Sequence, residues 1–478
     1  MKKPFYLTTT LPYVNAPLHV GHALEFVRAD AVARWNMLLG NEVFFNTGTD
    51  EHGLKIFQKA EEQGIDVQDF VNNGFVTFQK QVESFGVTKH IHYVRTTDAH
   101  HVAAAQEFWK RVQDRGYIYK KNYQAKYCVS CELERTDSEL VNGECPEHPG
   151  QPLEVISEEN YFFKISALEN EIKQLFDKRP DFVIPEFRFN EMKAFVSRGL
   201  KDFSISRLKD KMPWGIPVPG DEDQVMYVWF DALTNYITTL GWPEDQDTFT
   251  KFWTEGTPTQ YCGKDNTRFQ SVMWQSMLIA AGLPNSYQIV VNGHITAEGG
   301  TKMSKSLGNV VNPLEIADQY GTDALRLFLL KEISSYEDSP FTMDRFLQSY
   351  NAHLANGIGN LTSRILTLSE KHCEPLADFS EPVVPEAVME AMKVYDIQSA
   401  VQHLWSRISE LDVRIANERP FSVIKEDEAK GKELIAKLVR DLYEIARLLT
   451  PFLPETSHKI IELIKANKKP EVPLFARV

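Results

Sequence analysis

The segment FYLTTTLPYVNAPLHVGHALEFVRADAVARWNMLLGNEVFF, residues 5–45, has the pattern of one β-loop-α-β unit. Its first residues are strong strand formers, and Val43 to Phe45 predict a second strand. Between them, apolar side chains recur at helical spacing at Leu24, Val27, Ala31, Trp35 and Leu38. Gly40 is suited to end that helix. Because two strands joined by a helix usually pair in parallel through a right-handed crossover, the segment predicts an α/β fold with a parallel sheet.

Two histidines, His19 and His22, lie at the predicted start of this helix, with Gly21 between them. Free N–H groups and the positive end of the helix dipole make such a position an anion site at the carboxyl edge of a parallel sheet. Gly21 would let a flat ring approach the backbone, and the imidazoles can donate to phosphate oxygens. A metal site is an alternative, although no third ligand is near in sequence. Another alternative is that one histidine caps the helix and the other is an ordinary surface residue.

Composition places the chain among ordinary globular proteins. Its 478 residues predict two to four domains, and 43% of them are hydrophobic and 25% charged. We expect no membrane span and no secretory signal, since no apolar run approaches ~18 residues and the start MKKPFYLTTT has no apolar core. The net charge of −14 weakly disfavours nucleic acid as a partner, unless a local basic face is present. Five cysteines, three of them clustered, fit a reduced compartment, and we expect the cytoplasm.

The periodicity divides the chain into four parts. Residues 1–116 read as the first half of an α/β domain and residues 226–342 as its second half. Residues 117–225 have weaker periodicity and read as a connective insertion. Residues 343–478 carry long helical patterns that predict a helical bundle.

The cysteine cluster lies in the predicted insertion. Cys128 and Cys131 are separated by two residues, and Cys145 and His148 follow after thirteen more with the same internal spacing. Four such ligands suit tetrahedral zinc, and a full set of protein ligands leaves no open position, so we predict one structural zinc ion. A disulfide is the alternative, which the lack of a secretory pattern disfavours.

A glycine-flanked loop carries the sequence KMSKS from Lys302, and it includes Ser304 and Lys305. The helix after it is well delimited, with Asn312 as N-cap, Pro313 at the first position, Glu315 placed for a capping box and Gly321 at its end. Two lysines on a mobile loop that is anchored to a rigid helix can close over a polyphosphate. A solvated basic loop is the common alternative.

The order of HVGH and KMSKS resembles the two signatures of the class I aminoacyl-tRNA synthetases. The stretches LPYVNAPLHVGHA, GTDEHG, YVWFDALTNYI and GTKMSKSLGN extend the resemblance to the methionyl-tRNA synthetases, over essentially the whole chain. The resemblance implies activation of L-methionine with ATP and Mg²⁺, followed by transfer to tRNA(Met). It also implies that residues 1–116 and 226–342 form a Rossmann-like catalytic domain, and that the connective insertion carries a zinc knuckle.

The resemblance assigns roles residue by residue. It implies catalysis by His19, His22, Lys302 and Lys305, and ATP binding by these residues with Gly21, Ser304 and Asp265. It implies that methionine is bound by the Leu11 carbonyl and Asp50 at its ammonium group, and by Tyr13, Trp229, Ala232, Leu233, Tyr236 and Gln270 around its side chain. Gln270 is a departure, because relatives usually carry histidine there.

The helical part resembles the family's reader of the CAU anticodon. The resemblance implies base contacts by Asn360 and Arg364 and base stacking by Phe421, where relatives usually carry tryptophan. The alternative for Asn360 and Arg364 is that they are ordinary surface residues of a helix. No additional tRNA-binding dimerisation domain is recognised, so we expect a monomer. The rival functions are another class I synthetase, a tRNA-binding paralogue without activity, and an enzyme that adenylates a small molecule without tRNA.

Overall fold

The computed structural model describes residues 3–131, 133–135, 139–301, 303 and 311–478. The chain forms two compact units, each assembled from separate stretches of sequence. Unit 1 contains residues 1–18, 42–80 and 90–291, and unit 2 contains residues 19–41, 81–89 and 292–478. Each is described by itself below.

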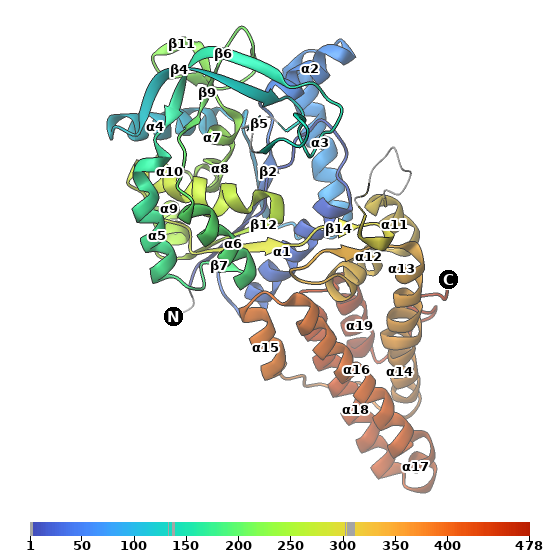
Figure 1. The fold of residues 1–478 in the computed structure, drawn as a ribbon. Helices are drawn as coiled ribbons and strands as arrows, with labels where there is room; N and C mark the ends of the chain where they lie inside the picture. The colour runs from blue at the N-terminus through green and yellow to red at the C-terminus, as the bar shows by residue number, and fades with distance from the viewer. Residues whose placement is uncertain (1–2, 132, 136–138, 302, 304–310) are drawn as a thin grey trace. The chain divides into compact units, whose positions relative to one another are not determined.

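Unit 1 is built on a six-stranded sheet with the order β3-β2-β1-β12-β13-β7 (Figure 1). β1 pairs in parallel with β2 and β12, β2 with β3, and β13 with β7, which confirms the parallel sheet expected from residues 5–45. The strands are β1 (Phe5–Thr8), β2 (Val43–Thr49), β3 (Ile91–Arg95), β7 (Val183–Ile184), β12 (Thr257–Gly263) and β13 (Gln288–Asn292). The strand order changes direction on either side of β1, which is where open α/β sheets bind ligands.

The helices of unit 1 bury an aromatic core. Phe108, Trp109, Phe230 and Trp274 are fully buried in one cluster, and the Phe108 and Trp274 rings stack at 5.7 Å. The helices are α2 (Leu54–Gln63), α3 (Val67–Ser84, whose end belongs to unit 2), α4 (Ala99–Asp114), η2 (Ile165–Leu168), α5 (Glu169–Lys178), α6 (Glu186–Ser197), α7 (Val228–Ala232), α8 (Asn235–Thr238), α9 (Gln246–Phe249), η3 (Thr250–Thr254), η4 (Lys264–Asn266), η5 (Phe269–Met273) and α10 (Trp274–Ala281). Residues of α7, α8 and α10 belong to this core, which holds in place the side chains on these helices that are discussed below.

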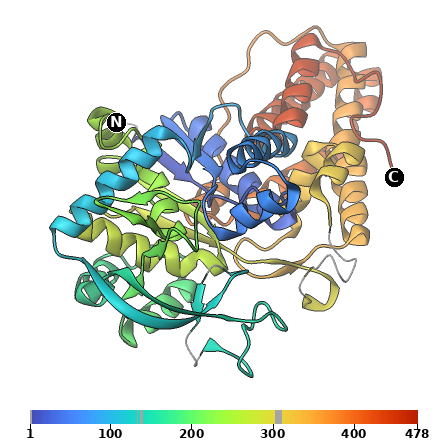
Figure 2. The ribbon, with the colours of Figure 1, turned by 90° about the horizontal axis from the view of Figure 1, so that it is seen from above.

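The region predicted as an insertion forms antiparallel sheets. A four-stranded sheet has the order β5-β4-β6-β8, and a three-stranded sheet has the order β10-β11-β9. The long β4–β6 pair, teal to green in Figure 1, runs along the lower edge of Figure 2. The strands are β4 (Ile118–Cys128), β5 (Leu133–Arg135), β6 (Glu154–Phe163), β8 (Phe203–Ser204), β9 (Ser206–Leu208), β10 (Pro217–Val218) and β11 (Asp221–Met226). β7, from the same stretch of sequence, pairs with β13 at the edge of the parallel sheet. The three domain boundaries predicted at 117, 226 and 343 stay a prediction.

In unit 2, α1 (Val20–Leu38) is buried on almost every side. The predicted apolar face is buried at Leu24, Val27, Ala31 and Trp35, but charged residues of the opposite face are buried as well. Arg28 donates to Asn292 Oδ1 and to the carbonyls of residues 333–335. Asp30 accepts from the backbone N–H of Thr88 at 2.7 Å and pairs with Arg326 at 2.7 Å. Because these buried charges make several hydrogen bonds to groups outside the helix, α1 is held firmly in place.

The rest of unit 2 is helical, as expected for residues 343–478. Its elements are β14 (Ile295–Thr296), η6 (Glu298–Gly300), α11 (Pro313–Tyr320), α12 (Thr322–Leu327), η8 (Phe328–Glu332), β15 (Ser339–Pro340), α13 (Met343–Ser349), η9 (Tyr350–Gly359), α14 (Asn360–His372), α15 (Glu386–Lys393), α16 (Ile397–Glu418), α17 (Pro420–Glu426), α18 (Glu428–Leu449) and α19 (Pro454–Ala466). Over the described stretches, the chain contains no helix with both the length and the apolar character required to cross a bilayer.

Candidate active site and metal centre

The two histidines of HVGH cap α1 reciprocally. His19 is the N-cap residue, and its Nδ1 accepts from the backbone N–H of Gly21 at 3.1 Å and of His22 at 3.4 Å. In return His22 Nδ1 accepts from the backbone N–H of His19 at 3.2 Å. The two imidazoles stack with 3.8 Å between ring centres. Because both Nδ1 atoms are acceptors, the neutral rings carry their protons on Nε2, where each can donate to an anion.

Gly21 makes room for this arrangement. A Cβ atom added at Gly21 would lie 2.9 Å from Cε1 and 3.0 Å from Nδ1 of His19. The imidazole of His19 lies against this glycine, and the approach of a ligand's flat ring to Gly21 stays a prediction. Any side chain at this position would therefore push His19 off its capping bonds.

The lysine-loop residues Lys302, Ser304 and Lys305 lie outside the described residues. The helix that follows, α11, has the predicted boundaries. Asn312 accepts from the backbone N–H of Leu314 at 3.1 Å, Pro313 is the first helical residue and Gly321 is the C-cap. Glu315 accepts from the side-chain amide of Asn312 at 2.9 Å and so holds the capping side chain in place.

In unit 1, the loop after β1 runs beside the end of β2. Tyr13 and Asp50 form an isolated parallel bridge, and the Asp50 backbone N–H donates to the Pro12 carbonyl at 3.1 Å. The Asp50 carboxylate is buried, with 6% of the residue exposed. This brings together three of the residues assigned to the methionine ammonium and side chain, since Leu11 precedes Pro12 directly.

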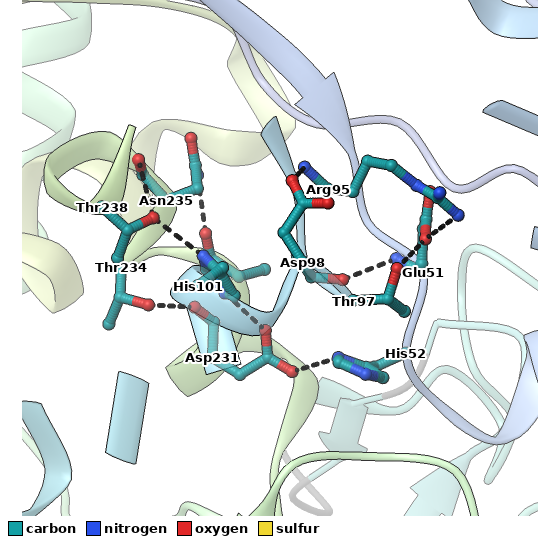
Figure 3. Close-up of polar contacts among 12 residues, drawn as sticks. Glu51, His52, Arg95, Thr97, Asp98, His101, Asp231, Thr234, Asn235 and Thr238 are labelled. Carbon is teal, nitrogen blue, oxygen red and sulfur yellow. Dashed lines mark hydrogen bonds and ion pairs between the residues drawn. The ribbon is translucent and has the colours of Figure 1, made fainter. Parts of the chain in front are cut away.

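Glu51 and Arg95 anchor the loop that contains Asp50 (Figure 3). Arg95 donates from Nε and Nη2 to the two carboxylate oxygens of Glu51, each at 2.8 Å. Glu51 is fully buried, and it also accepts from Thr49 at 2.6 Å and Thr97 at 2.5 Å. A bidentate pair with this many donors fixes the direction of the loop. Asp50 is therefore held by its own backbone bond to Pro12 and by the pair that the next residue, Glu51, forms with Arg95.

The next residue, His52, joins this loop to α7. Its Nδ1 lies 2.9 Å from Oδ2 of Asp231, and Nε2 of His101 lies 3.4 Å from Oδ1 of the same carboxylate (Figure 3). His101 Nδ1 in turn contacts Thr238 Oγ1 at 2.9 Å. Burial opposes ionisation of Asp231, but the charge of His52 and the hydrogen bond from His101 outweigh it and hold the pKa of this carboxyl below its usual range.

Most residues assigned to the methionine side chain gather around α7 and α8. Trp229 and Ala232 lie in α7, Leu233 ends it, and Tyr236 lies in α8. Gln270, on η5, donates from Nε2 to the hydroxyl of Tyr236. The Trp229 ring stacks on that of Phe269, the neighbour of Gln270, at 4.0 Å. Ala232, Leu233, Tyr236 and Gln270 are all buried, and Trp229 is partly exposed.

The four predicted metal ligands converge. The ligand atoms of Cys128, Cys131, Cys145 and His148 all lie within 4.8 Å of one another. The Cys131 and Cys145 sulfurs are 3.5 Å apart, and His148 Nδ1 is 3.1 Å from Cys131 Sγ and 3.8 Å from Cys128 Sγ. Sulfur ligands around a tetrahedral ion at ~2.3 Å are separated by roughly 3.8 Å, so these residues fit such an ion. They form a group that could bind a metal.

A cation lies beside this cluster. Arg135 donates to the sulfur of Cys131 at 3.0 Å and pairs with Glu147 at 2.8 Å. The Arg135 side chain is 8% exposed, so its charge acts in a poorly hydrated place. Around a divalent ion, three thiolates would carry a net negative charge, which the neighbouring guanidinium would offset.

Comparison with known proteins decides the family. The family model described as "tRNA synthetases class I (M)" matches residues 5–151 and 147–366. The chain is 38% identical to a methionine–tRNA ligase of Caldanaerobacter subterraneus subsp. tengcongensis, over 97% of this chain and 74% of that protein. It is 37% identical to a methionine–tRNA ligase of Mesorhizobium japonicum, over 99% of this chain and 94% of that protein.

The chain belongs to the methionine–tRNA ligases. Solved structures of this family share its fold. Mycobacterium tuberculosis methionyl-tRNA synthetase in complex with methionyl-adenylate matches 96% of this chain and 94% of its own, with a TM-score of 0.89 and 33% identity. The apo form of the same enzyme matches with a TM-score of 0.84 and 28% identity, over 100% of this chain and 99% of its own. The expected Rossmann-like class with a helical C-terminal region is thereby confirmed.

The remaining residues, which the family resemblance assigned to ATP and to the anticodon, lie at the surface of this ligase. Asp265 is exposed in the short helix η4, between β12 and η5. On the helical part, Asn360 is exposed at the start of α14, and Arg364 pairs with Asp412. Phe421 is 43% exposed on α17, with the guanidinium of Arg419 5.9 Å from its ring centre. An exposed aromatic ring beside a cation suits base stacking.

Sequence reasoning missed the residues that hold these ligase residues in place. Glu51 and His52 lie inside GTDEHG, and Asp231 lies inside YVWFDALTNYI, so both stretches had been singled out for their neighbours. Their partners Arg95 and His101 lie in no quoted motif. The available signal in the sequence was a charged residue inside each motif, because a charge that becomes buried on folding requires a partner elsewhere.

Proposed function

We propose that this chain activates L-methionine with ATP to methionyl-adenylate, releasing diphosphate, and then transfers the methionyl group to the 3′ end of tRNA(Met), releasing AMP. The observation that supports this most directly is the match over almost the whole chain to a relative solved with methionyl-adenylate. The gathering of Trp229, Ala232, Leu233, Tyr236 and Gln270 around α7 and α8 supplies an apolar and aromatic environment suited to a thioether.

In this proposal, unit 1 binds the amino acid. The Asp50 carboxylate is buried and negatively charged, so it can bind the methionine ammonium, and the Leu11 carbonyl would accept a hydrogen bond from the same group. Tyr13 and His19 belong to the same connection between β1 and α1. The chain therefore leads directly from the residues proposed for the amino acid to those proposed for the nucleotide.

Unit 2 supplies the groups proposed for the phosphates. The Nε2–H donors of His19 and His22, at the positive end of α1, would hold phosphate oxygens of ATP, which enters with Mg²⁺. Lys302 and Lys305 would stabilise charge that develops as the methionine carboxylate attacks the α-phosphorus and diphosphate leaves. Gly21 and Ser304 are proposed for further nucleotide contacts, and Asp265, a residue of unit 1, is proposed to bind the ATP ribose. These groups act by position and charge, and none forms a covalent intermediate.

An exchange assay across amino acids tests the reaction and its substrate together. Methionine is expected to support ATP–pyrophosphate exchange, with leucine, isoleucine, valine and cysteine slower by orders of magnitude. Charging of tRNA(Met) in the same preparation would separate a ligase from an enzyme that adenylates without tRNA. Exchange driven best by another amino acid would assign a different class I synthetase, and no exchange would indicate an inactive tRNA-binding paralogue.

The helical part is proposed to read the anticodon. Asn360 and Arg364, four residues apart on α14, would contact anticodon bases, and Phe421 would stack on one. Arg364 already pairs with Asp412, so RNA would have to compete for its guanidinium. We propose that the ligase works as a monomer.

We propose that Cys128, Cys131, Cys145 and His148 hold one structural zinc ion. Three thiolates and one imidazole are soft donors that zinc prefers, and four protein ligands leave no position for a substrate. The ion would tie the end of β4 to the loop that carries Cys145 and so stabilise the insertion. Free thiols at this density suit a reducing compartment such as the cytoplasm.

Metal analysis checks the zinc assignment. The purified protein is expected to contain one zinc per chain, and the Cys145→Ser variant none, because a three-ligand site binds far more weakly. Loss of zinc should also lower the melting temperature and expose the insertion to protease. Cys373→Ser is the matched control, since Cys373 lies outside the cluster, and it should keep the full zinc content. A metal-free wild-type protein of unchanged stability would contradict the assignment.

A further inference from the structure

A chain of buried side-chain amides runs from a backbone N–H to Tyr236. Its members are Gln275 on α10, Gln260 on β12 and Gln270 on η5, and each of the three is at most 2% exposed. Ser286, which precedes β13, stands at the start of the chain. No motif of the sequence pointed to Gln260, Gln275 or Ser286. Three consecutive buried amides are costly unless each is satisfied, so their arrangement needs a reason.

The direction of every hydrogen bond in this chain follows from its first member. The backbone N–H of Ser286 can only donate, and it donates to Gln275 Oε1 at 3.0 Å. The remaining amide atom of Gln275 is therefore Nε2. It donates to Ser286 Oγ at 3.0 Å, to Gln260 Oε1 at 3.4 Å and to the Gln270 carbonyl at 2.8 Å. The Ser286 hydroxyl also donates to Gln260 Oε1, at 2.5 Å.

The orientations of the next two amides are fixed in the same way. Since Gln260 Oε1 is occupied as an acceptor, Gln260 Nε2 faces Gln270 and donates to its Oε1 at 2.5 Å. Gln270 Nε2 then faces the hydroxyl of Tyr236 and donates to it. The Tyr236 oxygen thus receives a hydrogen bond from Gln270, and its own O–H hydrogen must point in another direction. An amide at Gln270 turned by 180° would reverse this, because its oxygen would take the tyrosine hydrogen.

Tyr236 is also fixed through its backbone. The hydroxyl of Tyr6, on β1, donates to the Tyr236 carbonyl at 2.6 Å. Burial, with a contribution from Tyr236, raises the pKa of Tyr6 well above its usual value, so this donor keeps its proton. Both the position of Tyr236 and the direction of its hydroxyl are therefore determined by buried groups.

We propose that Gln260 is a specificity-determining positioning residue, which through Gln270 makes the Tyr236 hydroxyl a donor toward the sulfur of methionine. The inference rests on the proposed function, in which Tyr236 borders the methionine side chain. A thioether sulfur accepts a weak hydrogen bond, whereas the CH₂ that replaces it in norleucine does not. The two side chains have nearly the same shape, so a donor of fixed direction distinguishes them where packing cannot.

The test compares methionine with norleucine in ATP–pyrophosphate exchange. Gln260→Met keeps the volume of the side chain but removes its amide, so Gln270 can turn over. The preference for methionine, measured as the ratio of the two kcat/KM values, is expected to fall about fivefold to tenfold, which corresponds to one modest hydrogen bond. The change should appear in KM for methionine, with kcat nearly unchanged.

Tyr236→Phe provides the matched comparison, because it removes the hydroxyl itself. Adding Gln260→Met to Tyr236→Phe should lower the ratio no further, since both changes act through the same donor. Ser286→Ala, a smaller change in the same chain, should give an intermediate fall and serves if Gln260→Met does not fold. An unchanged ratio in folded Gln260→Met, or additive effects in the double variant, would overturn the proposal. If wild-type protein exchanges with neither amino acid, the proposed function fails instead.

Discussion

Replacing His22 with alanine is expected to slow methionine-dependent ATP–pyrophosphate exchange by about two to three orders of magnitude. His22 Nδ1 is engaged with the backbone of His19, so its Nε2–H is oriented before any substrate arrives. A donor held in advance contributes more to a transition state than one that must be ordered during the reaction. The loss should appear mainly in kcat, because charge grows at the phosphates only as diphosphate leaves.

His458→Ala is the control for this variant. His458 is 71% exposed on α19 and contacts only a neighbouring glutamate of the same helix among the described residues. Its replacement should leave exchange unchanged. Because His22 also belongs to the cap of α1, the melting temperature of both variants must be recorded, and loss of a cap alone costs only about 1 kcal/mol. Near-normal exchange by folded His22→Ala would refute the role proposed for HVGH.

Asp231→Asn is expected to destabilise the protein by about 2–4 kcal/mol at neutral pH and to raise KM for methionine. The variant keeps the shape of the side chain but removes the negative charge that accepts from His52 and His101, and the loss of one member of a buried hydrogen-bonded network is among the most damaging changes. His52 follows Asp50 by two residues, so a displaced His52 disturbs the residue proposed to bind the methionine ammonium.

The pH dependence of stability gives this variant a distinct signature. The pKa of the Asp231 carboxyl is lower in the folded protein than in the unfolded chain. Its contribution is therefore complete above about pH 4, the ordinary value for aspartate, and is lost as pH falls through the lower folded value. The melting temperatures of wild type and Asp231→Asn should converge in acid. A constant difference between pH 7 and pH 3 would show that the charge is not responsible.

Asp245→Asn is the comparison for Asp231. Asp245 also has a lowered pKa, which its hydrogen bonds from the N-terminus of α9 cause, but it is exposed. Solvent screens its interactions, so the variant should lose much less stability and keep the wild-type KM for methionine.

Capping rules that depend only on adjacent residues correctly predicted the end of α1 and both ends of α11. Gly40 follows the last residues of α1 with a φ of 75°, and Asn312, Pro313 and Gly321 delimit α11 as the sequence indicated. Each of these positions depends on a few adjacent residues, so the sequence contains the whole cause. The cysteine spacing belongs to the same category, because two short turns bring its ligands together.

Features that depend on distant partners could not be predicted in the same way. The sequence indicated one apolar face on α1, whereas Arg28 and Asp30 are buried on other faces by groups hundreds of residues away. Likewise the burial of His52 and of Asp231 is explained by the contact between them, although they are 179 residues apart in the sequence. The roles proposed for HVGH, the methionine-binding residues and the anticodon residues came from resemblance to the family, and they stay predictions.

The burial of Arg28 and Asp30 has a consequence for how the protein is made. A ribosome delivers these residues early, but Arg326 and the carbonyls of residues 333–335 emerge only after most of the polypeptide has been synthesised. Until then the nascent segment 19–41 exposes apolar surface beside charges that lack their final partners. Folding of this segment must therefore wait for translation to approach its end, a period in which chaperones that bind extended chains would protect it from aggregation.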